Sequence, residues 1–176
     1  MAYKADLVTA IGDYEGFLDD ILDRVQFEGF DFDDFVQADH ICYRTIDEES
    51  YQLKRFQLHK VGKLLGETMV SGRPISTFRL TEPIDFEGWR IDAIELPAPK
   101  PNSGYTEGLE HIEFVLYDDF ETFLNKYPNR PYDKKSMERG INPELGLKLG
   151  EYAVKFHLLS LTTVVYLEKV LGIEKV

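Results

Sequence analysis

Two stretches of the sequence share one pattern and decide the fold: Asp39–Arg44 (DHICYR) and Glu110–Val115 (EHIEFV). In each, an acidic residue, a histidine and an isoleucine open a run of alternating side chains, which is typical of a β-strand. A second predicted strand follows later in each half and carries another possible metal ligand, Glu95 in the first and His157 in the second. The sequence therefore predicts a duplicated unit built around one shared ion.

The composition is that of one globular domain. A chain of 176 residues that is 43% hydrophobic can fill one core but not two independent ones. A net charge of −12 argues against nucleic-acid binding, which needs clustered Lys and Arg. The single cysteine, Cys42, excludes an intrachain disulfide framework, and no apolar run or signal-peptide core is evident. We expect a soluble, cytoplasmic protein that acts on a small molecule and binds no membrane.

The order of the predicted elements repeats. Apolar residues at three- and four-residue steps predict a helix over 8–26 within an N-terminal helical extension, residues 1–37. The first module, 38–97, is predicted as a strand, a helix and three strands, with a glycine-containing hairpin turn at 71–73. A Pro/Gly/Ser-rich linker at 97–104 separates it from the second module.

The second module, 105–160, repeats the order in shorter form, with irregular residues before its last two strands. A C-terminal helix, 161–176, is expected to pack its apolar face on the outside of the sheet. The predicted fold class is α+β: two βαβββ modules forming a curved mixed sheet around a central cleft, with helical additions at both ends.

Four motifs carry a resemblance to a known family: residues 39–44, 94–100 (IELPAPK), 108–113 (GLEHIE) and 154–157 (VKFH). They resemble the YecM-like family of the vicinal oxygen chelate superfamily, which includes glyoxalase I, extradiol dioxygenases and methylmalonyl-CoA epimerase. The resemblance covers about residues 36–160 and implies a single domain of that fold. It also implies a metal held by residues on the first and last strands of each half.

The resemblance places His40, Glu95, His111 and His157 at the metal positions. His157 is a departure, because better-known members commonly carry a carboxylate there. Side chains alternate along a strand, so each candidate can project to one face of a curved sheet. Imidazole and carboxylate without thiolate suit Zn²⁺, Fe²⁺, Ni²⁺, Co²⁺ or Mn²⁺ rather than Ca²⁺ or Mg²⁺. The fourth histidine, His59, falls in a helical pattern and is expected to be structural or exposed.

Three further residues are candidates for catalysis. Glu113 shares a strand face with His111 and could orient a ligand, replace one or act as a general base. Arg44 and Lys155 are predicted to face inward, where they either bind a substrate carboxylate or pair with acidic residues at the rim. Cys42 is expected to be a small core residue.

Two functions from different classes fit these residues. The first is a metal-dependent enzyme of isomerase, lyase or dioxygenase type, in which a small oxygenated metabolite chelates the ion. The second is a non-catalytic protein that sequesters a small ligand on the same sheet. The complete set of predicted ligands favours the enzyme.

Overall fold

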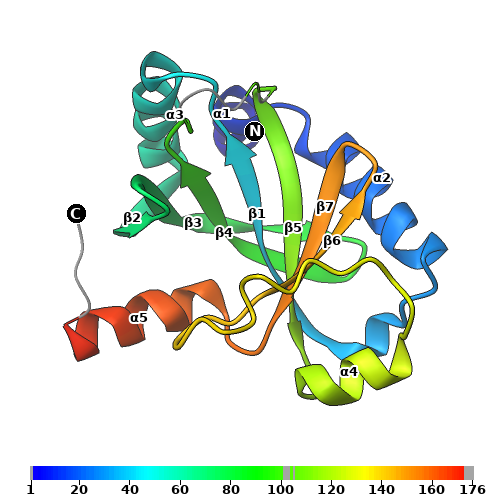
Figure 1. Ribbon diagram of the computed structural model, residues 1–176. Coiled ribbons are helices and arrows are strands. Elements are labelled where there is room, and N and C mark those ends of the chain that lie inside the picture. The colour runs from blue at the N-terminus through cyan, green and yellow to red at the C-terminus, as the bar shows by residue number, and fades with distance from the viewer. Residues whose placement is uncertain (1, 101–103, 105, 173–176) are drawn as a thin grey trace.

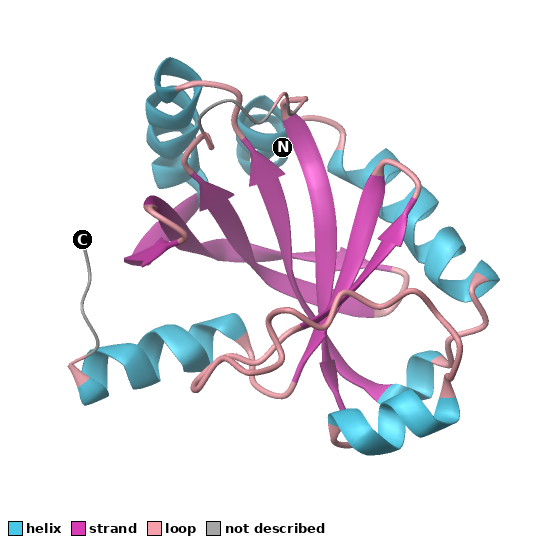
Figure 2. Cartoon of the chain, viewed as in Figure 1, coloured by secondary structure: helices cyan, strands magenta, loops and turns pink. Residues whose placement is uncertain are grey.

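The structure, a computed structural model, describes residues 2–100, 104 and 106–172. Within these residues five α-helices surround one seven-stranded mixed sheet (Figures 1 and 2). The strands are β1 (Phe35–Arg44), β2 (Gly62–Val70), β3 (Arg73–Phe86), β4 (Trp89–Pro97), β5 (Gly108–Leu116), β6 (Leu145–Leu149) and β7 (Tyr152–His157). The helices are α1 (Ala2–Ile11), α2 (Tyr14–Phe27), α3 (Glu48–Val61), α4 (Phe120–Lys126) and α5 (Leu161–Leu171).

Two related units meet at the centre of the sheet, whose strand order is β2-β3-β4-β1-β5-β7-β6. β1 pairs in parallel with β4, β5 pairs in parallel with β7, and β1 and β5 pair antiparallel with each other. This arrangement gives an approximate twofold axis between β1 and β5. The predicted α+β fold around a curved mixed sheet is confirmed.

The second unit has the shorter order predicted for it, with irregular residues and only two strands after its helix, and so lacks one strand of a full βαβββ module. Between α4 and β6 the chain is irregular, and an isolated bridge joins Asp133 to Gly146. Three prolines, Pro128, Pro131 and Pro143, interrupt this segment. Proline cannot donate to a strand ladder, so this stretch does not form the missing strand.

Two helices, α1 and α2, occupy the region where one helix was predicted over 8–26, and the short helical stretch predicted around 33–38 is a single 3₁₀ turn, Phe32–Asp34, followed by β1. Gly12, with φ of +78°, ends α1 in a left-handed conformation that glycine adopts without steric cost. Asp13 then caps α2, because its side chain accepts a hydrogen bond from the backbone N–H of Gly16 at 3.0 Å. The apolar periodicity continued across this break, which is why the pattern predicted one helix.

A row of apolar side chains crosses the sheet on its helix-covered face. It runs through register partners on six strands, and all of its members are buried: Phe78, Ile94, Ile41, Ile112, Val154 and Leu147. α3 contacts β2, β3 and β4, and α2 contacts β5, β6 and β7, so each helix covers one unit. Because side chains alternate, burying this row turns the two neighbouring rows, which carry the histidines, to the opposite face.

The C-terminal helix corrects an expectation. We expected α5 on the outside of the sheet, but Leu161, Val164 and Val165 line a cavity together with three of the four predicted metal ligands: His40, Glu95 and His111. Ser160 caps the helix, and Glu168 accepts a hydrogen bond from the Thr68 hydroxyl of β2 at 2.9 Å. The helix thus forms one wall of the site.

Among the described residues, no helix is long and apolar enough to cross a membrane.

Candidate metal centre

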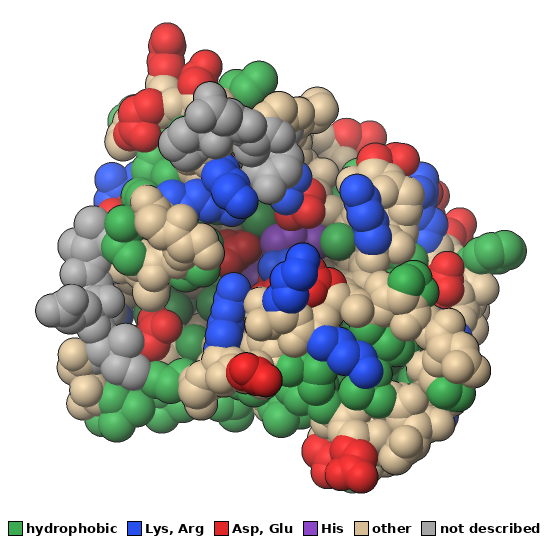
Figure 3. Space-filling model, in the orientation of Figure 1, with side chains coloured by type: hydrophobic (Ala, Val, Ile, Leu, Met, Phe, Trp, Pro, Cys, Tyr) green, Lys and Arg blue, Asp and Glu red, His purple; other side chains and the backbone are tan. Residues whose placement is uncertain are grey.

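A cavity of about 670 Å³ opens on the face of the sheet opposite the apolar row. Strands β1, β3, β4, β5 and β7 supply its floor, α5 supplies one wall, and the irregular segment 139–144 supplies another. Figure 3 shows this hollow with histidine and acidic side chains at its base and Lys or Arg side chains around it.

Two adjacent rows of the sheet build the base of the cavity. In one row His40 on β1 lies opposite Glu113 on β5, which in turn lies opposite Lys155 on β7. In the next row, Cys42 on β1 lies between Glu95 on β4 and His111 on β5. Neighbouring strands lie only about 4.8 Å apart. The register alone therefore brings these residues together from four strands.

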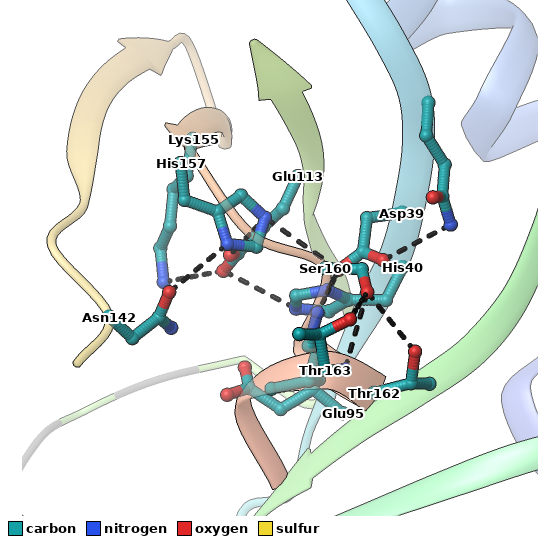
Figure 4. Close-up of polar contacts among 12 residues, drawn as sticks. Asp39, His40, Glu95, Glu113, Asn142, Lys155, His157, Ser160, Thr162 and Thr163 are labelled. Atoms are coloured by element: carbon teal, nitrogen blue, oxygen red, sulfur yellow. Dashed lines mark hydrogen bonds and ion pairs between the residues drawn. The ribbon is translucent and has the colours of Figure 1, made fainter. Parts of the chain in front are cut away.

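Each of the three site histidines is fixed through its Nδ1 atom. Nδ1 of His40 lies 2.8 Å from Oδ2 of Asp39, and Nδ1 of His111 forms a short hydrogen bond with Glu110. Nδ1 of His157 lies 3.3 Å from Oδ1 of Asn142 (Figure 4). A partner on one ring nitrogen sets the tautomer and directs the other nitrogen toward a ligand.

Two β-bulges place the acidic partners. Between β1 and β5 the register advances by two residues on β1 at Asp39, and by two residues on β5 at Glu110. An extra residue in a strand re-aims its side chain. Asp39 and Glu110 therefore reach the rings beside them, although simple alternation would turn them to the helix-covered face. Sequence reasoning assigned these two acids no role, and the repeated acid before each histidine was the available signal.

The remaining ring nitrogens fit a metal ion. Nε2 of His40, His111 and His157 are all buried and have no hydrogen-bond partner among the described residues. Oε1 of Glu113 lies 3.4 Å from Nε2 of His40 and 2.9 Å from Nε2 of His111, so these are ionic contacts without hydrogen-bond geometry. Buried polar atoms rarely stay unsatisfied, and three of them around one carboxylate indicate a ligand.

The spacing of the donor atoms agrees with this interpretation. One atom each from His40, Glu95, His111 and Glu113 lies within 4.8 Å of the others. Ligand atoms at about 2.1 Å from an ion lie about 3.4 Å apart in a tetrahedral site and about 4.2 Å apart on opposite sides of an octahedral one. These four residues therefore need only a small contraction to share one ion. His157 belongs to a neighbouring group with Asp39 and His40.

The charges of the site are strongly coupled. Burial lowers the pKa of His40, but attraction to Glu113 and the hydrogen bond to Asp39 raise it to about 10. Burial also lowers the pKa of His111, and its contacts with Cys42 and Glu110 more than offset this, so that pKa lies well above its usual range. Burial raises the pKa of Glu95, whereas its contact with His111 and attraction to Lys155 bring it to about 2.

Buried Glu113 and half-buried Lys155 form an ion pair, with Nζ 3.0 Å from Oε1. Burial would raise the pKa of Glu113, but attraction to Lys155 and His40 holds it well below its usual range. Burial would lower the pKa of Lys155, and attraction to Glu113 and Glu144 raises it well above its usual range instead. Burial lowers the pKa of His157. At neutral pH we therefore assign Glu113 as a carboxylate, Lys155 as an ammonium and His157 as a neutral imidazole.

The pairing of the strands shows which residues of the two halves are equivalent, and one pair differs from the prediction. If the twofold axis relates His40 to His111, it relates Cys42 to Glu113. Glu95 lies opposite Cys42, and Lys155 lies opposite Glu113. Lys155, not His157, therefore occupies the position equivalent to Glu95. His157 lies two residues further along β7, is fully buried and is not among the residues that line the cavity.

The other predicted residues fall as follows. Arg44 lines the cavity, and its Nη2 lies 2.8 Å from Oε1 of Glu110, so the predicted cation is paired with an acid. Cys42 is buried, and burial raises the pKa of its thiol to about 12, as expected of a core residue. His59 is exposed on α3, with its ring 5.1 Å from that of Phe78.

Sequence comparison identifies the family. The family model described as YecM protein matches residues 6–141. The chain belongs to the YecM family. Protein YecM of Escherichia coli is 33% identical over 151 residues, covering 76% of this chain and 79% of that protein. An uncharacterised protein of Haemophilus influenzae is 35% identical over 94 residues, covering 53% of this chain and 49% of that protein.

Solved structures support the same fold for this YecM family member. Protein EC4020 superposes with a TM-score of 0.72 at 32% identity, covering 86% of this chain and 87% of that one. A crystal structure of methylmalonyl-CoA epimerase superposes with a TM-score of 0.50 at 12% identity, covering 70% of this chain and 94% of that one. At this identity the likeness shows the fold, that of the vicinal oxygen chelate proteins.

Proposed function

We propose that this YecM family protein is a metal-dependent enzyme that acts on a small oxygenated acid. The ion is held by His40, Glu95 and His111, with Glu113 as the fourth ligand and His157 as the alternative. The observation that carries the proposal is the convergence of three buried Nε2 atoms without hydrogen-bond partners on one buried carboxylate. The donors are two imidazoles and two carboxylates, which suit Zn²⁺, Fe²⁺, Ni²⁺, Co²⁺ or Mn²⁺.

Glu113 is preferred over His157 because of what surrounds each side chain. Glu113 lines the cavity, and its Oε2 lies 3.4 Å from Nε2 of His157. Figure 4 shows Glu113 beside the ring of His157. His157 is therefore well placed to orient Glu113 from the side away from the cavity, together with Lys155 on Oε1.

The arrangement favours isomerase or lyase chemistry through proton transfer. A divalent ion in this site would stabilise negative charge on a substrate oxygen. The side chain of Glu95 is 15% exposed and that of Glu113 is 3% exposed, so Glu95 is the carboxylate that substrate reaches and the candidate proton acceptor. Lys155 lines the cavity as an ammonium and can donate a hydrogen bond to a developing oxyanion.

Metal analysis of protein prepared without a histidine tag tests the centre. After dialysis against Zn²⁺, Ni²⁺, Mn²⁺ or anaerobic Fe²⁺, we expect about one ion per chain by mass spectrometry. His111→Ala should lose the ion while its circular dichroism stays close to that of wild type. His59→Ala is the matched control, because it removes the histidine that lies outside the site, and it should keep the ion. Wild-type protein that takes up none of these ions would overturn the proposal.

Proton exchange in D₂O tests the reaction class. Metal-loaded protein is incubated with 2-oxo and 2-hydroxy acids and followed by proton NMR. Deuterium should enter at C3 of a 2-oxo acid, next to the carbonyl carbon, or at C2 of a 2-hydroxy acid, the carbon that bears the hydroxyl group. Oxygen consumption without exchange would indicate the dioxygenase class instead, which uses two histidines and one carboxylate on Fe²⁺. Binding with neither exchange nor oxygen consumption would favour the sequestering protein.

A further inference from the structure

The cations that line the cavity are not equivalent. Arg44 is paired with Glu110, Lys155 with Glu113, and Arg139 lies 3.8 Å from Glu144. Arg73 also lines the cavity, but no carboxylate of the described residues lies within ion-pair distance of it. Its Nη1 donates a hydrogen bond to the backbone carbonyl of Ala98 at 2.9 Å.

Arg73 lies at the far end of the cavity from the metal centre. It is the first residue of β3, next to the turn at Ser71 and Gly72. Thr77, four residues after Arg73 on β3, lies opposite Glu95. At about 3.3 Å per residue, Arg73 and Glu95 are separated by about 13 Å along the sheet. Residues 73, 75 and 77 alternate onto the cavity face, and all three line the cavity.

Most side chains that line the space between these two ends are apolar; the polar exceptions are Thr68, which lies opposite Ile75, and Glu168, which accepts its hydrogen bond. Ile75 and Pro97 come from the sheet, and Leu161, Val164 and Val165 come from α5. The cavity therefore has a cluster of candidate metal ligands at one end, a largely apolar middle and a half-buried guanidinium at the other end. A guanidinium presents five N–H donors in a fork that matches a carboxylate or phosphate. Within the part of the chain that the structure describes, the Arg73 side chain uses only its Nη1 donor, on the Ala98 carbonyl.

We infer that the site takes a bifunctional anion: chelating oxygens at one end, a short apolar segment, and a carboxylate or phosphate that binds Arg73 at the other. The chelating end rests on the proposed function, whereas the Arg73 end rests on the cavity alone. Partial burial strengthens a charge-assisted hydrogen bond of this kind. Arg73 would then determine specificity without taking part in the reaction.

Matched ligands test the inference by isothermal titration calorimetry on metal-loaded protein. The carboxylate arm compares 2-oxoglutarate with 2-oxopentanoate, which has the same carbon chain but ends in a methyl group. The phosphate arm compares 3-phosphoglycerate with glycerate. We expect wild-type protein to bind the bifunctional member of at least one pair at least tenfold more tightly. The arm with the larger ratio identifies the anion.

Three variants separate a binding role for Arg73 from a structural one. Arg73→Gln keeps a donor for the Ala98 carbonyl but loses the charge, so the affinity ratio should fall to about one while affinity for the monofunctional acid stays unchanged. Arg73→Lys should keep part of the preference. Arg79→Gln is the control, because Arg79 is on the same strand, is 59% exposed and pairs with Asp92 outside the cavity. It should keep the full ratio.

The outcomes distinguish this inference from the proposed function. Metal-loaded protein that binds the monofunctional acids but shows no preference in either arm overturns the inference and leaves the metal centre standing. An unchanged ratio in Arg73→Gln does the same. If the protein takes up no metal, the proposed function fails. The affinities of metal-free protein for glutarate and pentanoate then test whether Arg73 binds an anion. Arg73-dependent preference for glutarate supports it, and equal binding overturns it.

Discussion

Metal binding should release about two protons per ion at pH 7. In the metal-free protein, attraction to Glu113 and the hydrogen bond to Asp39 overcome burial and raise the pKa of His40 to about 10. The pKa of His111 is also well above its usual range. At pH 7, where Cys42 is a neutral thiol, three carboxylates within 3.4 Å of the His111 ring nitrogens hold that proton: Glu95, Glu110 and Glu113. Both rings therefore carry a proton that must leave before Nε2 can bind an ion. Glu95 and Glu113 are already ionised, because their pKa values are lowered, and they release none.

The expected number of released protons differs clearly from the number that two histidines with ordinary pKa values would release. With the usual pKa of about 6.5, each ring would be about one quarter protonated at pH 7, and two rings would release about 0.5 proton. For the buried pair, the affinity for the ion should fall about 100-fold for each pH unit lost between pH 8 and pH 6. Two ordinary histidines would give almost no pH dependence above about pH 7.

Calorimetric titration of Zn²⁺ in buffers of different ionisation enthalpy measures the number of protons directly. Glu113→Gln removes the strongest attraction on His40, so that variant should release fewer protons than wild type. His59→Ala should match wild type. A wild-type value near 0.5 would refute the assignment of two imidazolium groups to the metal-free site.

The same protons set the pH dependence of folding in the metal-free protein. A raised pKa in the folded state means that the stabilisation from His40 is fully present below its unfolded pKa of about 6.5 and is lost as pH rises through about 10. The metal-free protein should therefore lose stability between pH 7 and pH 10. The metal-loaded protein lacks these protons and should not show this loss.

Three substitutions make further predictions. Glu95→Gln keeps the shape of a ligand and removes its charge, so metal affinity should fall by at least about 10–100-fold in a chelator competition assay; unchanged affinity would leave Glu113 as the carboxylate ligand. Lys155→Met removes one of the three cations around buried Glu113 and leaves the His40 and His111 imidazolium groups, so it should cost about 1–3 kcal/mol in urea unfolding of metal-free protein. Lys148→Met, on the exposed face of β6, should cost under about 0.5 kcal/mol, and equal costs for the two variants would contradict a stabilising Lys155–Glu113 pair. Oδ2 of Asp39 contacts Nδ1 of His40 and accepts a hydrogen bond from the backbone N–H of Leu161. Asp39→Asn should therefore lower metal affinity about 10–100-fold and make α5 more sensitive to limited proteolysis. If neither quantity changes, Asp39 positions neither His40 nor α5.

The strand pattern predicted much of the fold. Ile41 and Ile112 occupy the same place in the two motifs, and in the structure they lie opposite each other at the centre of the buried row. Alternation from these residues correctly turns His40 and His111 to the other face. The period of two in the sequence is enough to establish this, because one buried face fixes the register of a strand.

Features that depend on pairing between distant segments could not be predicted in this way. The bulges at Asp39 and Glu110 break alternation, and only the pairing of β1 with β5 reveals them. The position equivalent to Glu95 depends on how β7 aligns with β5, and spacing along the chain placed it two residues away, at His157. The place of α5 depends on which face of the sheet remains uncovered, since an amphipathic helix shows only that it packs somewhere.

The difference between the two halves explains how one site can hold both a cation and an anion. The twofold axis exchanges Cys42 with Glu113 and Glu95 with Lys155, so one half contributes a single negative charge and the other contributes an ion pair. Two carboxylates would neutralise a divalent ion. Lys155 would then leave positive charge on the cavity side of the centre, although Glu144 offsets part of it. A symmetric site with a glutamate in place of Lys155 would instead repel an anion. The substitution on β7 therefore favours the same kind of ligand as Arg73 does at the other end of the cavity: one that brings its own negative charge to the ion.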